Sequence, residues 1–344
     1  MRAFATPFRT GFPLIAVLLA LSLAACSQPQ PRLEPDNLYW PPPPEQPRIK
    51  YVQSIYTEDD IGRVYNFREK LFGKDYFDGM TRPYGVSARR NRVLVTDIVM
   101  RKVLVFDRTT KRLVFLGSEG AYTIPAAAAA DAAGSIYVAD SGGNKVVVYD
   151  PSGTYRTAFL IGSGRPVGVA VDDARGRLYV LDRGLHRVVV FDLAGKQLFE
   201  FGGRGTDDGK LNLPLDITLD RAGQVYVLDS GNFRVQIFSP DGTFLSRFGM
   251  VGDRPGMFAN PKGIAVDSDG HIYVTDAAFG NFQIFDREGT VLLYVGELGA
   301  LAGNFHLPGG ISIDENDRIY VADQLNSRIQ VFQYLRSAAT ATLP

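Results

Sequence analysis

The sequence predicts an all-β fold in which six four-stranded units form a closed β-propeller. Its 344 residues contain an apolar strand that ends in aspartate and recurs six times, at steps of 42 to 47 residues. A proline-led apolar stretch precedes each copy, and a β-rich segment ending in an aromatic residue follows it, as in "KVLVF" and "RVQIF". Turns rich in glycine, proline and aspartate separate the segments. Four strands in just over forty residues are typical of one propeller blade.

The repeated units also resemble a known family. The strand that ends in aspartate reads "RVLVTD" in the first unit and "RIYVAD" in the last, and the proline-led stretch "PVGVAVD" is reduced to "PAAAAAD" in the second unit. These motifs resemble the NHL-repeat family, although the Asn-His-Leu trio is not preserved and its nearest forms begin at Asn144 and Asn326. The resemblance covers about residues 80–336 and implies a six-bladed β-propeller of NHL-type repeats. It implies no particular activity, because propellers host many functions.

A strand from the N-terminal side is expected to close the ring. The segment "RIKYVQSIY" at 48–56 precedes the first unit and resembles the fourth strands, whereas the last unit ends near Leu335 without one. We therefore expect 48–56 to pair with the last blade, so that the propeller comprises residues 48–336. Closure removes a sheet edge that would otherwise favour aggregation. Residues 337–344 are expected to form a disordered tail.

A single short helix is expected between the closing strand and the first blade, over residues 57–73. Thr57 and Asp60 form a capping-box pattern, and Gly73 can end the helix. Five apolar residues fall roughly on one helical face: Ile61, Val64, Tyr65, Leu71 and Phe72. We expect this face to pack on the propeller.

Residues 1–25 are typical of a lipoprotein signal peptide. Arg2 and Arg9 precede the apolar run 12–23, which is too short and too early for a convincing membrane span. The segment "LAAC" resembles the bacterial lipobox, which implies cleavage before Cys26, the only cysteine, and its lipidation. An ordinary cleaved signal with a chance cysteine is the alternative. By resemblance to Gram-negative sorting, Ser27 favours the outer membrane, on its periplasmic or surface face.

The lipidated cysteine and a proline-rich tether are expected over residues 26–47. The run Pro41–Pro44 favours extended polyproline II, which acts as a semi-rigid spacer. Trp40, the only tryptophan, lies beside this run. It could dock on a partner or on the protein's own surface, and we favour its own surface.

Charge and location exclude several classes of ligand. The chain carries 37 basic and 37 acidic residues, so it lacks the basic excess expected of a nucleic-acid-binding protein. An exported protein is also separated from nucleotides and nicotinamide cofactors. We therefore expect no nucleic acid and no cofactor, and we expect a monomer.

The six repeated aspartates are interpreted as structural clamps, because a reaction seldom needs the same group six times. Five residues after each aspartate lies a lysine, an arginine or, in the fifth unit, Asn281, which could pair with it across a tight hairpin. The predicted clamp residues are Asp97, Asp140, Asp182, Asp229, Asp276 and Asp323, with Lys102, Lys145, Arg187, Arg234 and Arg328.

No metal or catalytic site is expected from the sequence. His186, His271 and His306 fall at different phases of the repeat, so they do not form the set that the similar peptidyl-hydroxyglycine lyases use for zinc. Asp216 replaces a glycine of the repeat and could point into the central channel, as calcium ligands do in lactonase-like propellers, but one ligand is not a site. "DSDG" at 267–270 is expected to be a turn. No G-x-S-x-G nucleophile elbow occurs.

The remaining candidate site is one face of the propeller. The loops between second and third strands share this face with the loops between blades, and both sets carry apolar residues. Apolar loop tips that gather on one face can mark a binding site. The predicted partner-binding residues are Met100, Leu185, His186, Phe233, Phe279 and Leu325. For Phe258 and Phe305 in the inter-blade loops, filling gaps between blades is an equally good explanation.

These features predict a lipid-anchored, non-catalytic scaffold that binds a protein or peptide in the cell envelope. Two alternatives stay open. One is a metal-dependent enzyme of the lyase or lactonase kind with a site in the central channel, which a tightly bound metal would favour. The other is an envelope sensor or carbohydrate-binding module, which stacked exposed aromatic side chains would favour.

Overall fold

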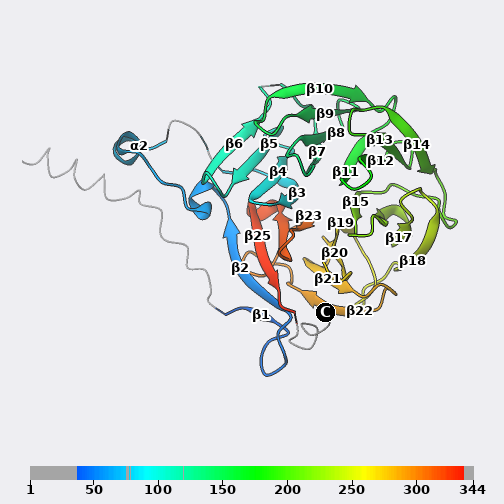
Figure 1. Ribbon diagram of the computed structural model, residues 1–344. Coiled ribbons are helices and arrows are strands. Elements are labelled where there is room, and N and C mark those ends of the chain that lie inside the picture. The colour runs from blue at the N-terminus through cyan, green and yellow to red at the C-terminus, as the bar shows by residue number, and fades with distance from the viewer. Residues whose placement is uncertain (1–36, 75–76, 78, 119, 337–344) are drawn as a thin grey trace, which may run out of the picture. The chain divides into compact units, whose positions relative to one another are not determined.

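Six antiparallel sheets follow one another around a central axis in the computed structural model, which describes residues 37–74, 77, 79–118 and 120–336 (Figure 1). Five sheets have four strands each and the sixth has five. The first strand of each blade is innermost and contacts the first strands of its two neighbours. The predicted six-bladed β-propeller is therefore confirmed. The predicted signal peptide 1–25, Cys26 and the tail 337–344 lie outside the described residues.

Blades 1 to 5 each consist of four consecutive strands. Blade 1 comprises β3 (Pro83–Arg89), β4 (Arg92–Asp97), β5 (Lys102–Asp107) and β6 (Arg112–Leu116). Blade 2 comprises β7 (Pro125–Ala130), β8 (Ile136–Asp140), β9 (Lys145–Tyr149) and β10 (Tyr155–Leu160). Blade 3 comprises β11 (Pro166–Asp172), β12 (Arg177–Asp182), β13 (Arg187–Asp192) and β14 (Gln197–Gly202). Blade 4 comprises β15 (Asp216–Leu219), β16 (Val225–Asp229), β17 (Arg234–Phe238) and β18 (Phe244–Phe248). Blade 5 comprises β19 (Pro261–Val266), β20 (Ile272–Asp276), β21 (Asn281–Phe285) and β22 (Val291–Val295).

The hydrophobic core lies between neighbouring blades. Each of its six clusters is built mainly from buried side chains of two adjacent sheets, because successive residues of a strand point to opposite faces and both faces are covered. The second strands contribute fully buried tyrosines in blades 3 to 6. The Tyr273 hydroxyl donates to Asp267 and the Tyr320 hydroxyl to Asp314, each at 3.0 Å. Each ring therefore adds apolar area to the core while its polar end keeps a partner.

Blade 6 closes the ring with strands from both ends of the propeller sequence. It comprises β23 (Pro308–Ile313), β24 (Arg318–Asp323), β25 (Arg328–Tyr334), β2 (Ile49–Ile55) and β1 (Tyr39–Trp40). In Figure 1 the blue β2 lies along the red β25, and the two pair antiparallel. The side chains of Ile49 and Ile55 are fully buried. The closing strand predicted at 48–56 is confirmed.

Strand β1 lies in the segment predicted as tether. Its residues pair with β2, and the amide of Arg48 donates to the carbonyl of Trp40 at 2.7 Å. The chain turns back between the two strands, so Pro41–Pro44 form part of a hairpin loop and not an extended spacer. The Trp40 ring packs edge-on against Phe332 with 5.8 Å between centroids, so it docks on the protein's own surface. Residues 39–47 therefore belong to the propeller, and the predicted tether 26–47 is correspondingly shorter.

Two short helical segments replace the single helix predicted over 57–73. The capping box of Thr57 and Asp60 starts a 3₁₀ helix, η2 (Glu58–Ile61), which ends at Gly62 in the left-handed region with φ 84°. Asn66 then caps α2 (Phe67–Phe72), the only α-helix among the described residues. The short helix expected before blade 1 is therefore present as α2, but it is confined to Phe67–Phe72 because a left-handed glycine and a second N-cap divide the predicted range 57–73.

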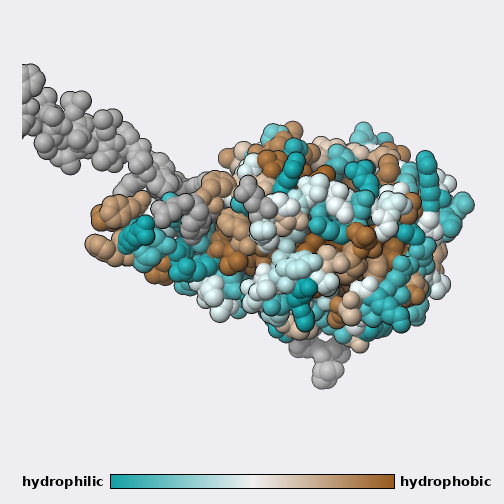
Figure 2. All heavy atoms as spheres, turned by 90° about the horizontal axis from the view of Figure 1, so that it is seen from above, coloured by the Kyte–Doolittle hydropathy of each residue, from teal (hydrophilic) through white to brown (hydrophobic). Residues whose placement is uncertain are grey.

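The apolar side chains of α2 do not pack on the propeller, contrary to the expectation. Phe67 is 83 % exposed and Phe72 is 75 % exposed. The brown side chains that project at the left of Figure 2 lie where Figure 1 places α2. Of the predicted apolar face, Ile61 does contact the core between blades 6 and 1. No helix in the described part of the chain is long and apolar enough to cross a membrane.

Truncating Ile49 tests the role of the closing strand. Ile49→Ala should lower the free energy of unfolding by about 2–4 kcal/mol, because it leaves a cavity where β2 meets the core. Chemical denaturation of the purified protein measures this change. Val52→Ala on the same strand is the control, since Val52 is 42 % exposed and its truncation should cost no more than about 0.5 kcal/mol. Equal effects of the two substitutions would contradict a closing role for β2.

Candidate functional site

One buried aspartate in each blade holds the loops of one face in place. These six residues, which we call the aspartate latch, end the second strands and are fully buried: Asp97, Asp140, Asp182, Asp229, Asp276 and Asp323. Each carboxylate accepts a backbone N–H, at 2.6–3.0 Å, from a residue one or two positions before the proline that leads the first strand. The sequence analysis missed this contact. The near-constant spacing of 14 to 16 residues between that proline and the aspartate is its signal.

Four blades also contain the predicted ion pair. Nitrogen–oxygen distances are 2.8 Å for Arg234–Asp229 and 2.7 Å for Arg328–Asp323, where both partners are buried. The pairs Arg187–Asp182 at 3.3 Å and Lys145–Asp140 at 3.8 Å are longer and have more exposed cations. The two buried guanidinium groups also donate to loop carbonyls, so each arginine joins the second-strand end to the loop that enters its blade. Hydrogen bonds of this kind offset the cost of burying the pair.

Blades 1 and 5 lack the ion pair in the described part of the chain. The ammonium of Lys102 lies 4.8 Å from the ring centre of Phe115, and Asp97 accepts the amides of Val99 and Met100 instead. The predicted pairing of Lys102 with Asp97 is therefore wrong, because the aromatic ring competes for the cation. In blade 5 the side-chain oxygen of Asn281 is buried without a partner.

Three long loops enter blades 4, 5 and 6 with the same internal structure. Each forms a short parallel bridge, Arg204 with Leu211, Val251 with Phe258 and Leu298 with Phe305. A glutamine of the third strand accepts a glycine amide of the loop at 2.7–2.9 Å in each case: Gln236, Gln283 and Gln330. The side chains of Phe258 and Phe305 are fully buried. They therefore fill gaps between blades, which is one of the two explanations considered for them.

The predicted partner-binding residues differ in their exposure. Leu185 is 41 % exposed and Leu325 is 50 % exposed. Met100, His186, Phe233 and Phe279 are half-buried. The loop face also exposes apolar residues that the sequence analysis did not select: Val99, Leu213, Met250, Val251, Leu298 and Leu301. The loop face thus exposes more apolar side chains than predicted, and some of them belong to residues other than the predicted ones.

Leu185, His186 and Leu213 lie together on this face, and we call them the loop-face patch. The amide of Leu213 donates to Nδ1 of His186 at 2.9 Å, which requires the imidazole nitrogen to be unprotonated. Burial, together with the positive charges of Arg204 and Arg183, lowers the pKa of His186 below its ordinary value. His186 is therefore neutral near pH 7 and extends the apolar surface of the two leucines.

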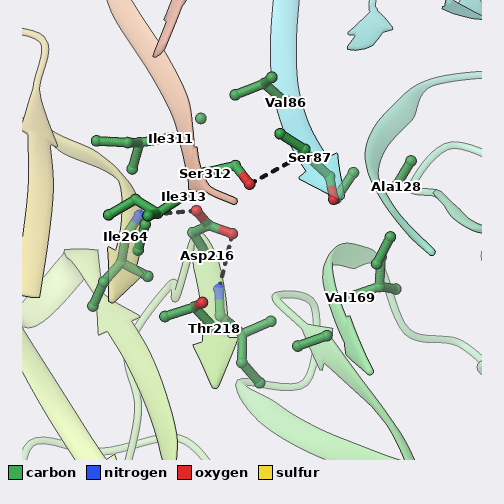
Figure 3. A pocket seen from close by; sticks show the side chains of 18 of the residues that line it. Val86, Ser87, Ala128, Val169, Asp216, Thr218, Ile264, Ile311, Ser312 and Ile313 are labelled. Atoms are coloured by element: carbon green, nitrogen blue, oxygen red, sulfur yellow. Dashed lines mark hydrogen bonds between the residues drawn. The ribbon is translucent and has the colours of Figure 1, made fainter. Parts of the chain in front are cut away.

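A cavity of about 330 Å³ lies on the propeller axis. Figure 3 shows its wall, to which first strands contribute apolar side chains such as Val86, Val169 and Ile264. Asp216 lies in this wall and accepts the amides of Ile217 and Ile264, each at 2.9 Å. Burial raises the pKa of Asp216 to about 7, against the lowering effect of these two amides. The channel thus contains one carboxyl group that can change its charge near neutral pH.

The three histidines lie apart, as their repeat phases suggested. Nδ1 of His271 lies 2.8 Å from Asp267, and this hydrogen bond raises the pKa of His271 above its ordinary value. His306 is exposed in the loop that enters blade 6. Across the described residues, no three His, Cys, Asp or Glu side chains gather closely enough to hold a metal ion.

Removing one latch carboxylate tests its structural role. Asp229→Ala leaves the buried Arg234 guanidinium without its carboxylate, so the free energy of unfolding should fall by about 3–5 kcal/mol. The matched control is Asp208→Ala, because Asp208 pairs with Arg247 on the surface and such pairs contribute at most about 1 kcal/mol. Denaturant titrations of both variants measure the difference. A latch variant as stable as the control would contradict the assignment.

Comparisons with known proteins agree with this architecture. The NHL repeat model matches residues 164–191, 211–238, 258–285 and 305–332, which lie in blades 3 to 6 and the loops that enter them. A search of curated proteins finds no match.

Several solved structures share the fold. A protein of unknown function from Bacteroides thetaiotaomicron is 20% identical over 75% of this chain and 70% of its own, with a TM-score of 0.58. An auxiliary nutrient binding protein from the same organism is 14% identical over 76% and 71%, with a TM-score of 0.59. Virginiamycin B lyase from Staphylococcus aureus is 12% identical over 83% and 100%, with a TM-score of 0.57. Identities this low show the fold alone, so the chain is shown to contain NHL repeats in blades 3 to 6 and to fold as a six-bladed β-propeller.

Proposed function

We propose that the chain is a lipid-anchored, non-catalytic scaffold that binds a protein or peptide of the cell envelope with the loop face of its propeller. The observation that carries this proposal is the apolar surface of that face. Exposed apolar side chains come from the hairpins between second and third strands and from the inter-blade loops, both of which the latch and the loop bridges hold rigidly. A preformed apolar surface with a polar surround suits a protein partner, because little order is lost on binding.

The loop-face patch is the part of this surface best suited to anchor a partner. Leu185 and Leu213 are 41 % and 43 % exposed, and neutral His186, next to Leu185 in the same hairpin, accepts the amide of Leu213. Leu325, 50 % exposed, provides a second apolar contact in blade 6. Contacts of this kind gain energy from the apolar area that a partner removes from water.

Attachment at Cys26 would hold the propeller close to a membrane. Ten residues, 27–36, separate Cys26 from the first described residue, Asn37. A chain of ten residues spans at most roughly 35 Å. We infer that the acylated cysteine holds the propeller at the outer membrane within that distance, so the scaffold meets only partners of the envelope.

Substitution of Cys26 tests the anchor. Cys26→Ala should move the protein from the sedimented membrane fraction to the soluble fraction of lysed cells, because the acyl chains would no longer be attached. Ser27→Ala, one residue later, should leave the protein with the membranes. Immunoblots of the two fractions measure both outcomes. Membrane association that survives Cys26→Ala would contradict lipid anchoring.

Loss of the apolar contacts tests the binding face. The double variant Leu185→Ala with Leu325→Ala should recover about ten-fold less of a specific partner in crosslinked pull-downs from native envelopes, since buried apolar anchors dominate binding energy. Mass spectrometry identifies and quantifies the partner.

The matched control is Leu245→Ala with Leu292→Ala, two leucines of similar exposure on the outer strands β18 and β22. A partner lost equally from both variants, or kept by both, would refute this face as the site. Recovery of no partner from the wild type would refute the scaffold function and favour a small ligand in the channel.

A further inference from the structure

Three cations come from strand ends that surround the channel on the loop face, and we call them the cationic mouth. Arg82 immediately precedes Pro83 of β3, Arg183 immediately follows the latch residue Asp182, and Lys262 is the second residue of β19. These positions are all at the strand ends that the latch joins. Lys262 also lines the axial cavity.

The repeat shows which way Arg183 lies. Ser230 holds the equivalent position in blade 4, directly after the latch residue, and its hydroxyl donates to the carbonyl of Pro261 at 3.2 Å. A residue at this position therefore faces the start of the next blade's first strand, beside the channel. The effects of Arg183 on the pKa values of two neighbouring residues agree with its position beside the channel. Burial and the charge of Asp216 raise the pKa of Tyr84, and the charge of Arg183 acts against them. Burial and then the charge of Arg183 lower the pKa of Lys262.

The cationic mouth has no anionic partner within the described residues. None of its three side chains forms an ion pair there, and the Nε atoms of Arg82 and Arg183 are buried without a hydrogen-bond partner. Two carboxylates, Asp216 and Asp276, lie near enough for their charges to influence the pKa values of Tyr84 and Lys262, respectively. The oxygens of both carboxylates already accept backbone amides. Asp216 accepts the amides of Ile217 and Ile264, and Asp276 accepts loop amides. Buried donors without partners and like charges close together both destabilise a fold.

We propose that the cationic mouth binds a carboxylate group of an acidic peptide segment of the partner. This inference rests on the proposed function and gives it a chemical specificity. Guanidinium and ammonium groups bind carboxylates through short charge-assisted hydrogen bonds. A carboxylate at the mouth would supply the acceptor that Arg183 and Lys262 lack, while the surrounding leucines of the loop face bury the rest of the peptide.

The apolar walls and negative charges of the channel favour binding of the ligand's carboxylate at the cationic mouth and not deeper inside. The walls beyond it are largely apolar, and Asp216 adds a negative charge when it is ionised. The opposite end is lined by Asp220 and Glu315, and by Asp173, which pairs with Arg89. An anion therefore meets attraction at the loop face and repulsion deeper in, which favours an acidic group at the tip of a partner segment over a free anion passing through the channel.

Titration calorimetry with two short peptides tests this inference on the full protein purified from envelopes in detergent. One peptide is acetylated and amidated and contains two central aspartates, and the other is acetylated tetra-alanine with a free C-terminal carboxylate. Amidated tetra-alanine is the uncharged reference. At least one acidic peptide should bind more tightly than the reference, and which one binds distinguishes a side-chain carboxylate from a chain terminus.

Variants locate the binding. Arg183→Gln and Lys262→Gln should each weaken the acidic peptide by about ten-fold, whereas Lys196→Gln, an exposed lysine of the β13–β14 hairpin, should not. In peptide-free buffer Lys262→Gln should also raise the melting temperature by roughly 2 °C, because it relieves repulsion from Arg183. A purely structural pair of cations would instead lose stability.

Each outcome decides a separate question. Equal binding of acidic and uncharged peptides, or equal loss of affinity in the Lys196 control, would overturn the cationic mouth as a carboxylate site. Specific binding of an acidic peptide by a protein that recovers no envelope partner would keep the site and refute the scaffold function. Recovery of a partner that binds the Arg183→Gln variant as well as it binds the wild type would keep the scaffold function and refute the carboxylate site.

Discussion

The buried aspartate at the end of each second strand is the constraint on which the propeller face depends. A carboxylate removed from water must have its oxygens occupied by donors, or it costs several kcal/mol. In this chain the donors are backbone amides of the loop that enters the same blade. Loop position and strand position are thereby coupled in every blade. The loops of this face are thereby held to the strand ends, even though they contain no regular secondary structure over most of their length.

Closure of the ring adds a second constraint of longer range. The pairing of β2 with β25 joins the two ends of the propeller sequence and covers the outer edge of β25. The chain then continues through η2 and α2 into blade 1, so the segment between the closing strand and the first blade lies outside the ring. This route explains why α2 exposes phenylalanines: the core between blades 6 and 1 is filled largely by strand residues, and from the connecting segment Ile61 and Met80 reach it.

Most of the fold could be predicted from the sequence because its signals are local and repeated. Strand, turn and aspartate recur in every unit, and even the alanine-rich β7 forms where the repeat requires a strand. Features that depend on one competing contact could not be predicted. Gly62 interrupts the expected helix, and the Phe115 ring takes Lys102 away from Asp97. The cationic mouth was missed for a related reason: Arg82, Arg183 and Lys262 occupy three different phases of the repeat in three different blades, so only the ring brings them together.

The three long loops that enter blades 4, 5 and 6 have a further consequence for recognition. A ring of six similar blades would offer a partner six nearly equivalent angular positions around the axis. The bridged loops occupy only one half of the circumference, while blades 2 and 3 are entered by shorter connections. The loop face therefore lacks the approximate sixfold symmetry of the blades, and its six angular positions are not equivalent. A partner that touches both halves can therefore dock in only one rotational setting about the propeller axis.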